Sequence, residues 1–132
     1  MAGIRGFDNW LGVVLGSPDP VALAHFYRDL LGWEIAAEEP AWVTMQLRDA
    51  EGKGLPANLA FQLETSYTRP VWPNEPGRQE MQFHLDVAVT DVEAAVADAI
   101  ALGAVLAEFQ PQDDVRVMLD PDGHPFCLYL SR

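Results

Sequence analysis

Two residues with chemically active side chains, His84 and Asp86, stand two positions apart in a segment where polar and apolar residues alternate. Side chains of a β-strand alternate between its two faces, so this spacing puts the imidazole and the carboxylate on the same face. A histidine titrates near neutral pH and can serve as a general base or as a hydrogen-bond donor to a bound carbonyl. We therefore take His84 as the candidate catalytic residue, the alternative being a histidine that only anchors the sheet. His25 and His124 are expected to be structural.

The same alternation in the other predicted strands identifies the residues that share a face with His84. Where one alternate set is apolar and packs on the helices, the other set faces away from them. The face turned away from the helices is predicted to carry Trp42, Thr44, Gln46, Gln62, Glu64, His84, Asp86, Arg116, Met118, Cys127 and Tyr129. This mixture of polar, aromatic and sulfur-containing side chains predicts a ligand cleft, with a subunit interface or a plain solvent face as alternatives. Phe83 is predicted to face the helices together with Leu85.

Three further residues have specific expected roles. Arg116 is the one guanidinium predicted on this face, and it suits a ligand carboxylate, although a pairing with Asp86 or Glu64 is equally consistent. Trp72 is expected either to close over the cleft as a lid or to seal a dimer contact. Cys127 has no neighbour in sequence that would lower its pKa, so we expect it to act as a small hydrophobe in the cleft wall.

The elements that position these residues come from a pattern that occurs twice in the chain. Each copy has an alternating apolar run, an aspartate, a helical period and then Leu-Gly. In the first copy a helix is predicted over Pro20–Leu31, with proline at its first position and Gly32 as its stop. In the second copy Thr90 and Glu93 have the spacing of a capping box, and Gly103 is the predicted stop.

Each predicted helix is followed by three predicted strands, at residues 33–37, 42–48 and 58–64 in the first copy and 105–109, 115–119 and 125–130 in the second. The sequence thus predicts an α+β fold of two tandem βαβββ modules that form a curved mixed sheet around a central cleft. We expect a single domain over residues 1–132, with one module at 10–64, a connecting segment at 65–80 and the other module at 81–131.

Composition excludes several classes of function. The chain has 132 residues, of which 49% are hydrophobic, so it can form a core and is of single-domain size. A net charge of −12 repels phosphate backbones and anionic membranes, so neither nucleic acid nor a membrane is an expected partner. With a single cysteine and no signal-peptide pattern, we expect a soluble protein of the cytoplasm.

Three segments of the sequence resemble the vicinal oxygen chelate superfamily of glyoxalase, bleomycin-resistance and extradiol-dioxygenase proteins. These segments are Ser17–Trp33, His84–Asp91 and Asp120–Cys127. The chain looks closest to the glyoxalase-like subfamily, which also carries Phe-Gln in the first module and Trp-Pro in the connecting segment, here Phe61-Gln62 and Trp72-Pro73. The resemblance implies a fold and, because this fold hosts several chemistries, no single reaction.

The resemblance also implies where a metal would bind. Superfamily members that use a metal take ligands from the first and last strands of each module, which correspond here to Gly12, Gln62, His84 and Cys127. Glycine offers no side-chain ligand, and the remaining His, Gln and Cys mix hard and soft donors, so we expect no conventional metal site and no cofactor.

The expected function is binding of a small organic molecule in the cleft between the modules, as in bleomycin-resistance proteins, without the usual metal. The alternative is a lyase, isomerase or dioxygenase of the superfamily, acting on a small carbonyl or aromatic metabolite with His84 as base or ligand. Whether the protein is an enzyme stays open at this point. The predicted ligand contacts are Trp42, Thr44, Gln62, Trp72, Asp86, Arg116, Cys127 and Tyr129. The resemblance also implies a homodimer.

Overall fold

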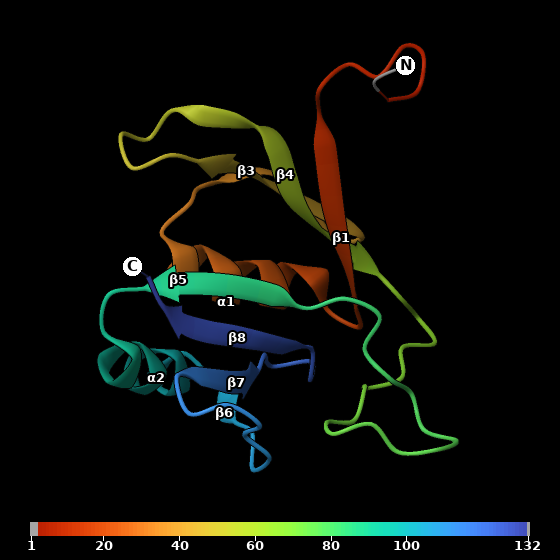
Figure 1. Cartoon of the computed structure of the whole chain (residues 1–132). Helices are drawn as coiled ribbons and strands as arrows, with labels where there is room; N and C mark the ends of the chain where they lie inside the picture. Colours follow the sequence, from red (N-terminus) through yellow and green to blue (C-terminus); the bar gives the residue numbers. More distant parts are fainter. Residues whose placement is uncertain (1–2, 132) are drawn as a thin grey trace. The chain divides into compact units, whose positions relative to one another are not determined.

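A computed structural model describes residues 3–131 as two compact units that divide between Thr65 and Ser66. Each unit has one helix and one four-stranded mixed sheet, and the order of elements is the same in both (Figure 1). The fold class is therefore α+β with two tandem βαβββ modules, as predicted from the repeated pattern.

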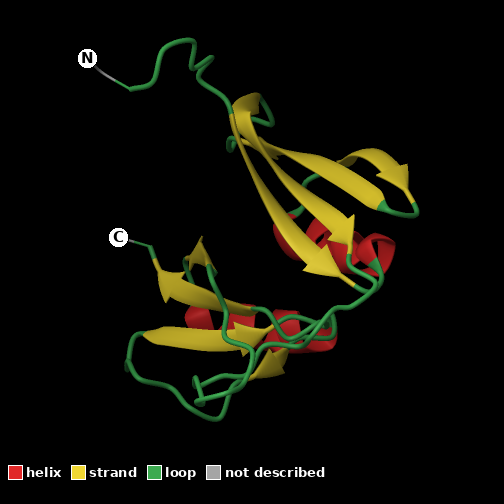
Figure 2. Ribbon diagram, turned by 90° about the vertical axis from the view of Figure 1, so that its right-hand side faces the viewer, coloured by secondary structure: helices red, strands yellow, loops and turns green. Residues whose placement is uncertain are grey.

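The first unit contains β1 (Leu11–Ser17), α1 (Pro20–Leu31), β2 (Ile35–Glu39), β3 (Trp42–Arg48) and β4 (Gly54–Leu63). Its strands lie in the order β1-β4-β3-β2. Strand β1 runs parallel to β4, and the other neighbouring pairs are antiparallel. Figure 2 shows the helix of each unit lying along its sheet.

Helix α1 begins and ends at the residues predicted. The Asp19 side chain caps it by accepting a hydrogen bond from the Ala22 amide, Pro20 occupies the first turn, and Gly32 ends it in the left-handed conformation with φ of 74°. The buried side of the helix packs on β4, where the rings of Tyr27 and Phe61 stack with centroids 5.7 Å apart. This packing fixes the helix-facing side of the first sheet.

The second unit contains β5 (Leu85–Val89), α2 (Val92–Ala101), β6 (Val105–Leu106), β7 (Val115–Leu119) and β8 (Pro125–Leu130), with the strand order β5-β8-β7-β6. The cap of α2 differs from the prediction. Asp91, not Thr90, is the N-cap, and its side chain accepts from the Ala94 amide at 3.0 Å. Both residues are suitable caps, and the aspartate occupies the same place as Asp19 of the first unit.

Several boundaries in the two sheets differ from those predicted. Strand β2 begins at Ile35, two residues later than expected, β4 begins earlier, at Gly54, and β6 has only two residues. Phe83, predicted to face the helices, lies outside β5 and is 86% exposed. Strands β3, β7 and β8 have the predicted bounds.

The connecting segment packs on the second unit through three side chains. Tyr67 Oη donates to the Asp122 carbonyl at 2.8 Å, Arg69 Nη1 donates to the Pro121 carbonyl at 2.8 Å, and Trp72 Nε1 donates to the Phe109 carbonyl at 3.1 Å. The first two contacts are with the turn between β7 and β8. Among the described residues, neither helix is long and apolar enough to cross a membrane.

Candidate functional site

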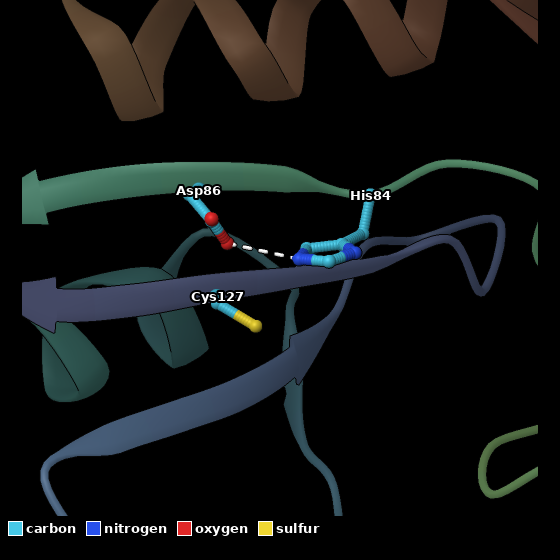
Figure 3. Close-up of side chains that lie close together, drawn as sticks. All are labelled: His84, Asp86 and Cys127. Atoms are coloured by element: carbon cyan, nitrogen blue, oxygen red, sulfur yellow. Dashed lines mark ion pairs between the residues drawn. The ribbon is translucent and has the colours of Figure 1, made fainter.

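The site is built on two neighbouring strands of the second unit. His84 immediately precedes β5, Asp86 is the second residue of β5, and Cys127 is the third residue of β8. The parallel register pairs Asp86 with Cys127, so their side chains lie next to each other on one face of the sheet. Figure 3 shows His84, Asp86 and Cys127 on that face.

The polar atoms of this cluster are close together. His84 Nε2 lies 3.0 Å from Asp86 Oδ1. The ligating atoms of His84, Asp86 and Cys127 all lie within 4.8 Å of one another. This contact is an ion pair when the imidazole is protonated, and in a neutral His84 either ring nitrogen can carry the single proton.

The cluster forms one wall of a hollow of about 420 Å³, which we call the β5–β8 hollow. Its lining consists of His84, Asp86, Gln112, Asp114, Val115, Cys127, Tyr129 and Leu130. This volume is within the range of small-molecule sites in proteins, roughly 300–1,000 Å³. The hollow therefore has room for a small organic ligand.

Burial and charge set the state of the thiol. Burial raises the pKa of Cys127, and the neighbouring Asp86 carboxylate raises that pKa further by repelling the thiolate and by hydrogen bonding to the thiol. Cys127 is therefore a neutral thiol at neutral pH. This agrees with its expected role as a small hydrophobe and does not favour a nucleophilic role.

Arg116 is not on the face predicted for it. The register pairs Arg116 with Leu128, which is buried on the helix-facing side of the sheet, so Arg116 lies on that side too. Its Nη1 donates to the Gln112 and Val115 carbonyls, and its side chain lines a separate hollow of about 390 Å³ together with Val92 and Val96 of α2. Met118, predicted on the cleft face, pairs with Phe126 and is also buried on the helix side.

The predicted ligand contacts of the first module share one face of its sheet. Trp42 pairs with Gln62 and Thr44 pairs with Ala60, whereas Val43 pairs with Phe61 in the buried layer. Gln62 Nε2 donates to Glu64 Oε1 at 2.8 Å. The face assignment of these three residues is thus confirmed, and their role in ligand binding stays a prediction.

Trp72 has a packing contact in addition to its hydrogen bond. Its ring lies with its centroid 5.9 Å from that of Phe109. It is not among the residues that line the β5–β8 hollow. Its contacts within the described part of the second unit are those of a residue that fastens the connecting segment.

Four residues of the hollow were missing from the sequence prediction: Gln112, Asp114, Val115 and Leu130. Gln112 and Asp114 precede β7 in a loop, where no periodicity predicts the direction of a side chain. The sequence predicts Val115 on the helix side, because it belongs to the fully apolar alternate set and Arg116 belongs to the other set. The register of β7 against β8, which pairs Val115 with Tyr129, places it correctly.

The other two histidines pair with carboxylates elsewhere. His25 Nε2 lies 2.6 Å from Glu38 Oε1, and the side chains of both residues are about two-fifths exposed. His124 Nδ1 lies 2.8 Å from the fully buried Asp120 carboxylate, at the turn that Tyr67 contacts. Neither histidine lines the β5–β8 hollow.

The four positions from which the superfamily takes metal ligands do not form a suitable donor set here. Gly12 has no side-chain donor, and a Cβ built on it would come within 2.7 Å of Asn58 Oδ1, so a larger residue would need the neighbourhood to shift. Gln62, His84 and Cys127 then combine an amide oxygen, an imidazole nitrogen and a thiol, which mix hard and soft donors. A different set, His84, Asp86 and Cys127, brings a nitrogen, an oxygen and a sulfur together within the second unit.

Comparison with known proteins identifies relatives across nearly the whole chain. A family model described as a glyoxalase-like domain matches residues 12–129. No curated protein matches the sequence significantly.

Three solved structures illustrate the similarity of fold. A glyoxalase-related enzyme from Fulvimarina pelagi has a TM-score of 0.65 and 20% identity, covering 95% of this chain and 89% of that one. A glyoxalase/bleomycin resistance protein/dioxygenase family enzyme from Burkholderia phytofirmans PsJN has a TM-score of 0.62 and 20% identity, covering 90% and 95%. Lactoylglutathione lyase from Agrobacterium tumefaciens has a TM-score of 0.60 and 17% identity, covering 96% of each chain. At these identities the likeness concerns the fold alone.

Proposed function

Since the chain belongs to the glyoxalase-like domain family of the vicinal oxygen chelate superfamily, we propose that it binds a small organic molecule in the cytoplasm, in the β5–β8 hollow. The observation that carries this proposal is the hollow itself, with His84 and Asp86 in its wall. The proposed ligand site includes His84 and Cys127, two of the four metal positions of the superfamily, and it does not depend on a metal at those positions.

The lining of the hollow supports binding of a ligand with both polar and apolar parts. His84, Asp86 and Gln112 offer hydrogen-bonding groups for orientation, and Tyr129, Val115 and Leu130 offer apolar surface. The Tyr129 ring is 38% exposed and Leu130 is 41% exposed, so both are accessible to a ligand. A few polar groups in a partly apolar wall are typical of small-molecule sites.

The charge of the hollow indicates which ligands it favours. Asp86 and Asp114 are in its lining, and no lysine or arginine lines it within the part of the chain that the structure describes. The net charge of −12 adds to the negative field. We therefore expect neutral or cationic planar molecules to bind in preference to anionic ones.

Fluorescence titration with three planar dyes tests the proposal: neutral Nile red, cationic proflavine and anionic 8-anilinonaphthalene-1-sulfonate. Saturable binding is expected, tightest for proflavine, and Tyr129→Ala should weaken it about tenfold through the lost aromatic contact. His84→Ala should also weaken binding, whereas His25→Ala, which breaks a similarly exposed histidine–carboxylate pair, should not. Absence of saturable binding with all three dyes would contradict the proposal.

A second candidate function, a metal-independent isomerase or lyase, is supported by the pairing of His84 with Asp86. In this pair the Asp86 carboxylate stabilises the imidazolium that forms when the His84 ring accepts a proton from a carbon next to a carbonyl. Exchange of the carbon-bound protons of dihydroxyacetone in D2O, followed by proton NMR, measures this step. The exchange should disappear in His84→Ala and persist in His25→Ala; exchange that survives in His84→Ala removes His84 from that role.

We also propose that the protein is a homodimer. The edge strand β1 exposes three apolar residues within the described chain: Leu11 (65%), Val13 (38%) and Val14 (47%). Exposed apolar residues on an edge strand favour a contact with a second copy of the chain. Analytical ultracentrifugation should give twice the chain mass of 14.6 kDa. A monomer mass at micromolar concentration would contradict this part of the proposal.

A further inference from the structure

We infer that His84, Asp86 and Cys127 form a binding site for a divalent cation of borderline softness, such as Zn²⁺ or Co²⁺, built wholly within the second unit. The juxtaposition of an imidazole, a carboxylate and the only thiol of the chain carries this inference. It goes beyond the proposed function, which needs no metal.

The distances suit a common metal ion. In tetrahedral Zn²⁺ sites the bonds are about 2.0–2.3 Å long, which puts neighbouring ligand atoms roughly 3.3–3.8 Å apart. The three ligating atoms of the cluster lie within 4.8 Å of one another, and the His84 Nε2 to Asp86 Oδ1 distance is 3.0 Å. Side-chain adjustments of about 1 Å or less therefore bring all three atoms onto one ion.

The backbone holds the three side chains in this arrangement. Asp86 and Cys127 are register partners on adjacent parallel strands, and His84 stands two residues before Asp86, so it shares the same face. No loop movement is required to gather them. Two of the three ligands thus lie on neighbouring strands of one sheet and the third immediately precedes one of them, which holds them more firmly than a long loop would.

The donor set selects among metals. A thiolate and an imidazole favour Zn²⁺ or Co²⁺ over Mg²⁺ and Ca²⁺, which prefer oxygen ligands. When the sulfur coordinates, the thiol proton leaves to solvent, and the charges of the thiolate and the Asp86 carboxylate balance the two charges of the ion. Three protein ligands leave a fourth position, which faces the β5–β8 hollow that these residues line.

This site differs from the ligand set that the superfamily resemblance implies. It keeps His84 and Cys127 from that set and takes Asp86 of the same module in place of Gly12 and Gln62 of the first module. A bound metal also competes with the use of His84 as a base, because an ion bound at Nε2 occupies a ring nitrogen and replaces the contact of His84 with Asp86. Occupancy by a metal and the metal-independent isomerase reaction are therefore alternatives.

Titration of the metal-free full chain with Co²⁺, followed by absorption spectroscopy, tests the inference. Cys127 is the only cysteine in the sequence, so a sulfur-to-cobalt charge-transfer band in the near ultraviolet can come from no other residue. The band should appear with one equivalent of Co²⁺, be displaced by Zn²⁺ and resist excess Mg²⁺. It should be absent in Cys127→Ser.

Further variants separate a three-ligand site from a lone thiol. His84→Ala and Asp86→Asn should each weaken Co²⁺ binding by more than about tenfold, because even the loss of an outer-sphere partner has that effect. His25→Ala, which removes the similarly exposed histidine paired with Glu38, should leave the titration unchanged. Circular dichroism verifies that each variant is folded.

Two results would overturn the inference. One is the absence of a charge-transfer band in the folded wild-type protein with one equivalent of Co²⁺. The other is a band of unchanged affinity in both His84→Ala and Asp86→Asn, which would mean that the thiol alone attracts the metal. Neither result bears on the dye titrations, so failure of the metal site and failure of the ligand hollow are distinguishable.

Discussion

Replacing Asp120 by alanine tests how the turn between β7 and β8 is held together. The Asp120 carboxylate is fully buried and accepts from the backbone amides of Asp122 and His124 at 2.9 and 3.0 Å. It also pairs with His124 Nδ1 at 2.8 Å. This turn sets the register of β8, which carries Cys127 and Tyr129.

The expected loss in the free energy of unfolding follows from the donor groups that lose their acceptor. Asp120→Ala leaves two part-buried amides and one ring N–H unpaired, and each unsatisfied donor costs about 1–3 kcal/mol. Allowing for partial access of water to Asp122 and His124, we expect a loss of roughly 3–5 kcal/mol in the free energy of unfolding. Asp120→Asn keeps one oxygen acceptor for the two amides but removes the charge and the second oxygen, which lies 2.8 Å from His124 Nδ1, so its loss should be smaller, about 1–2 kcal/mol.

Urea denaturation followed by circular dichroism measures both variants against the wild type. Equal slopes of free energy against urea concentration would show that the variants differ in stability alone. A loss below about 1 kcal/mol for Asp120→Ala would refute the reasoning, since it would mean that water replaces the carboxylate without penalty. A loss for Asp120→Asn as large as that for Asp120→Ala would show that the charged contact with His124, and not the acceptor for the two amides, holds the turn.

Three further predictions concern the caps, the thiol and the connecting segment. Asp19→Ala and Asp91→Ala should each lower the free energy of unfolding by about 1 kcal/mol in urea denaturation, because each removes the side-chain acceptor of one helix N-terminus. Because the pKa of Cys127 is raised, the rate of its alkylation by iodoacetamide should rise with pH at a higher midpoint than for a free cysteine. Asp86→Asn should lower that midpoint only in part, since burial raises the pKa more than the Asp86 carboxylate does. Gly123→Ala should lower the free energy of unfolding in urea denaturation by about 1 kcal/mol or more, because Gly123 has φ of 91° and a Cβ there would come within 2.6 Å of Arg69 Cγ.

The elements that local chemistry defines could be predicted from the sequence. Helix α1 was predicted to the residue because Pro20 and Gly32 admit one start and one stop. The faces of β4, β5 and β8 followed from strict alternation, in which buried residues such as Phe61 and Leu128 leave Gln62 and Cys127 on the other side. In such strands a shift by one residue would exchange the two faces.

The parts that depend on pairing between strands could not be predicted in this way. Strand β7 is apolar at nearly every position, so alternation could not decide which face Arg116 occupies, and only its pairing with Leu128 does. The cluster of His84, Asp86 and Cys127 likewise needs the register of β5 against β8. The sequence placed all three residues on one face, whereas the position of Cys127 directly beside Asp86 follows only from that register.

The most direct test of the central claim, that the β5–β8 hollow is the ligand site, is a titration of 15N-labelled protein with proflavine, followed by amide NMR spectra. We predict that the largest shift changes fall on residues 84–86, 112–115 and 127–130, which include the lining of the hollow. Saturable changes confined to other parts of the chain, or no change at millimolar proflavine, would contradict the claim.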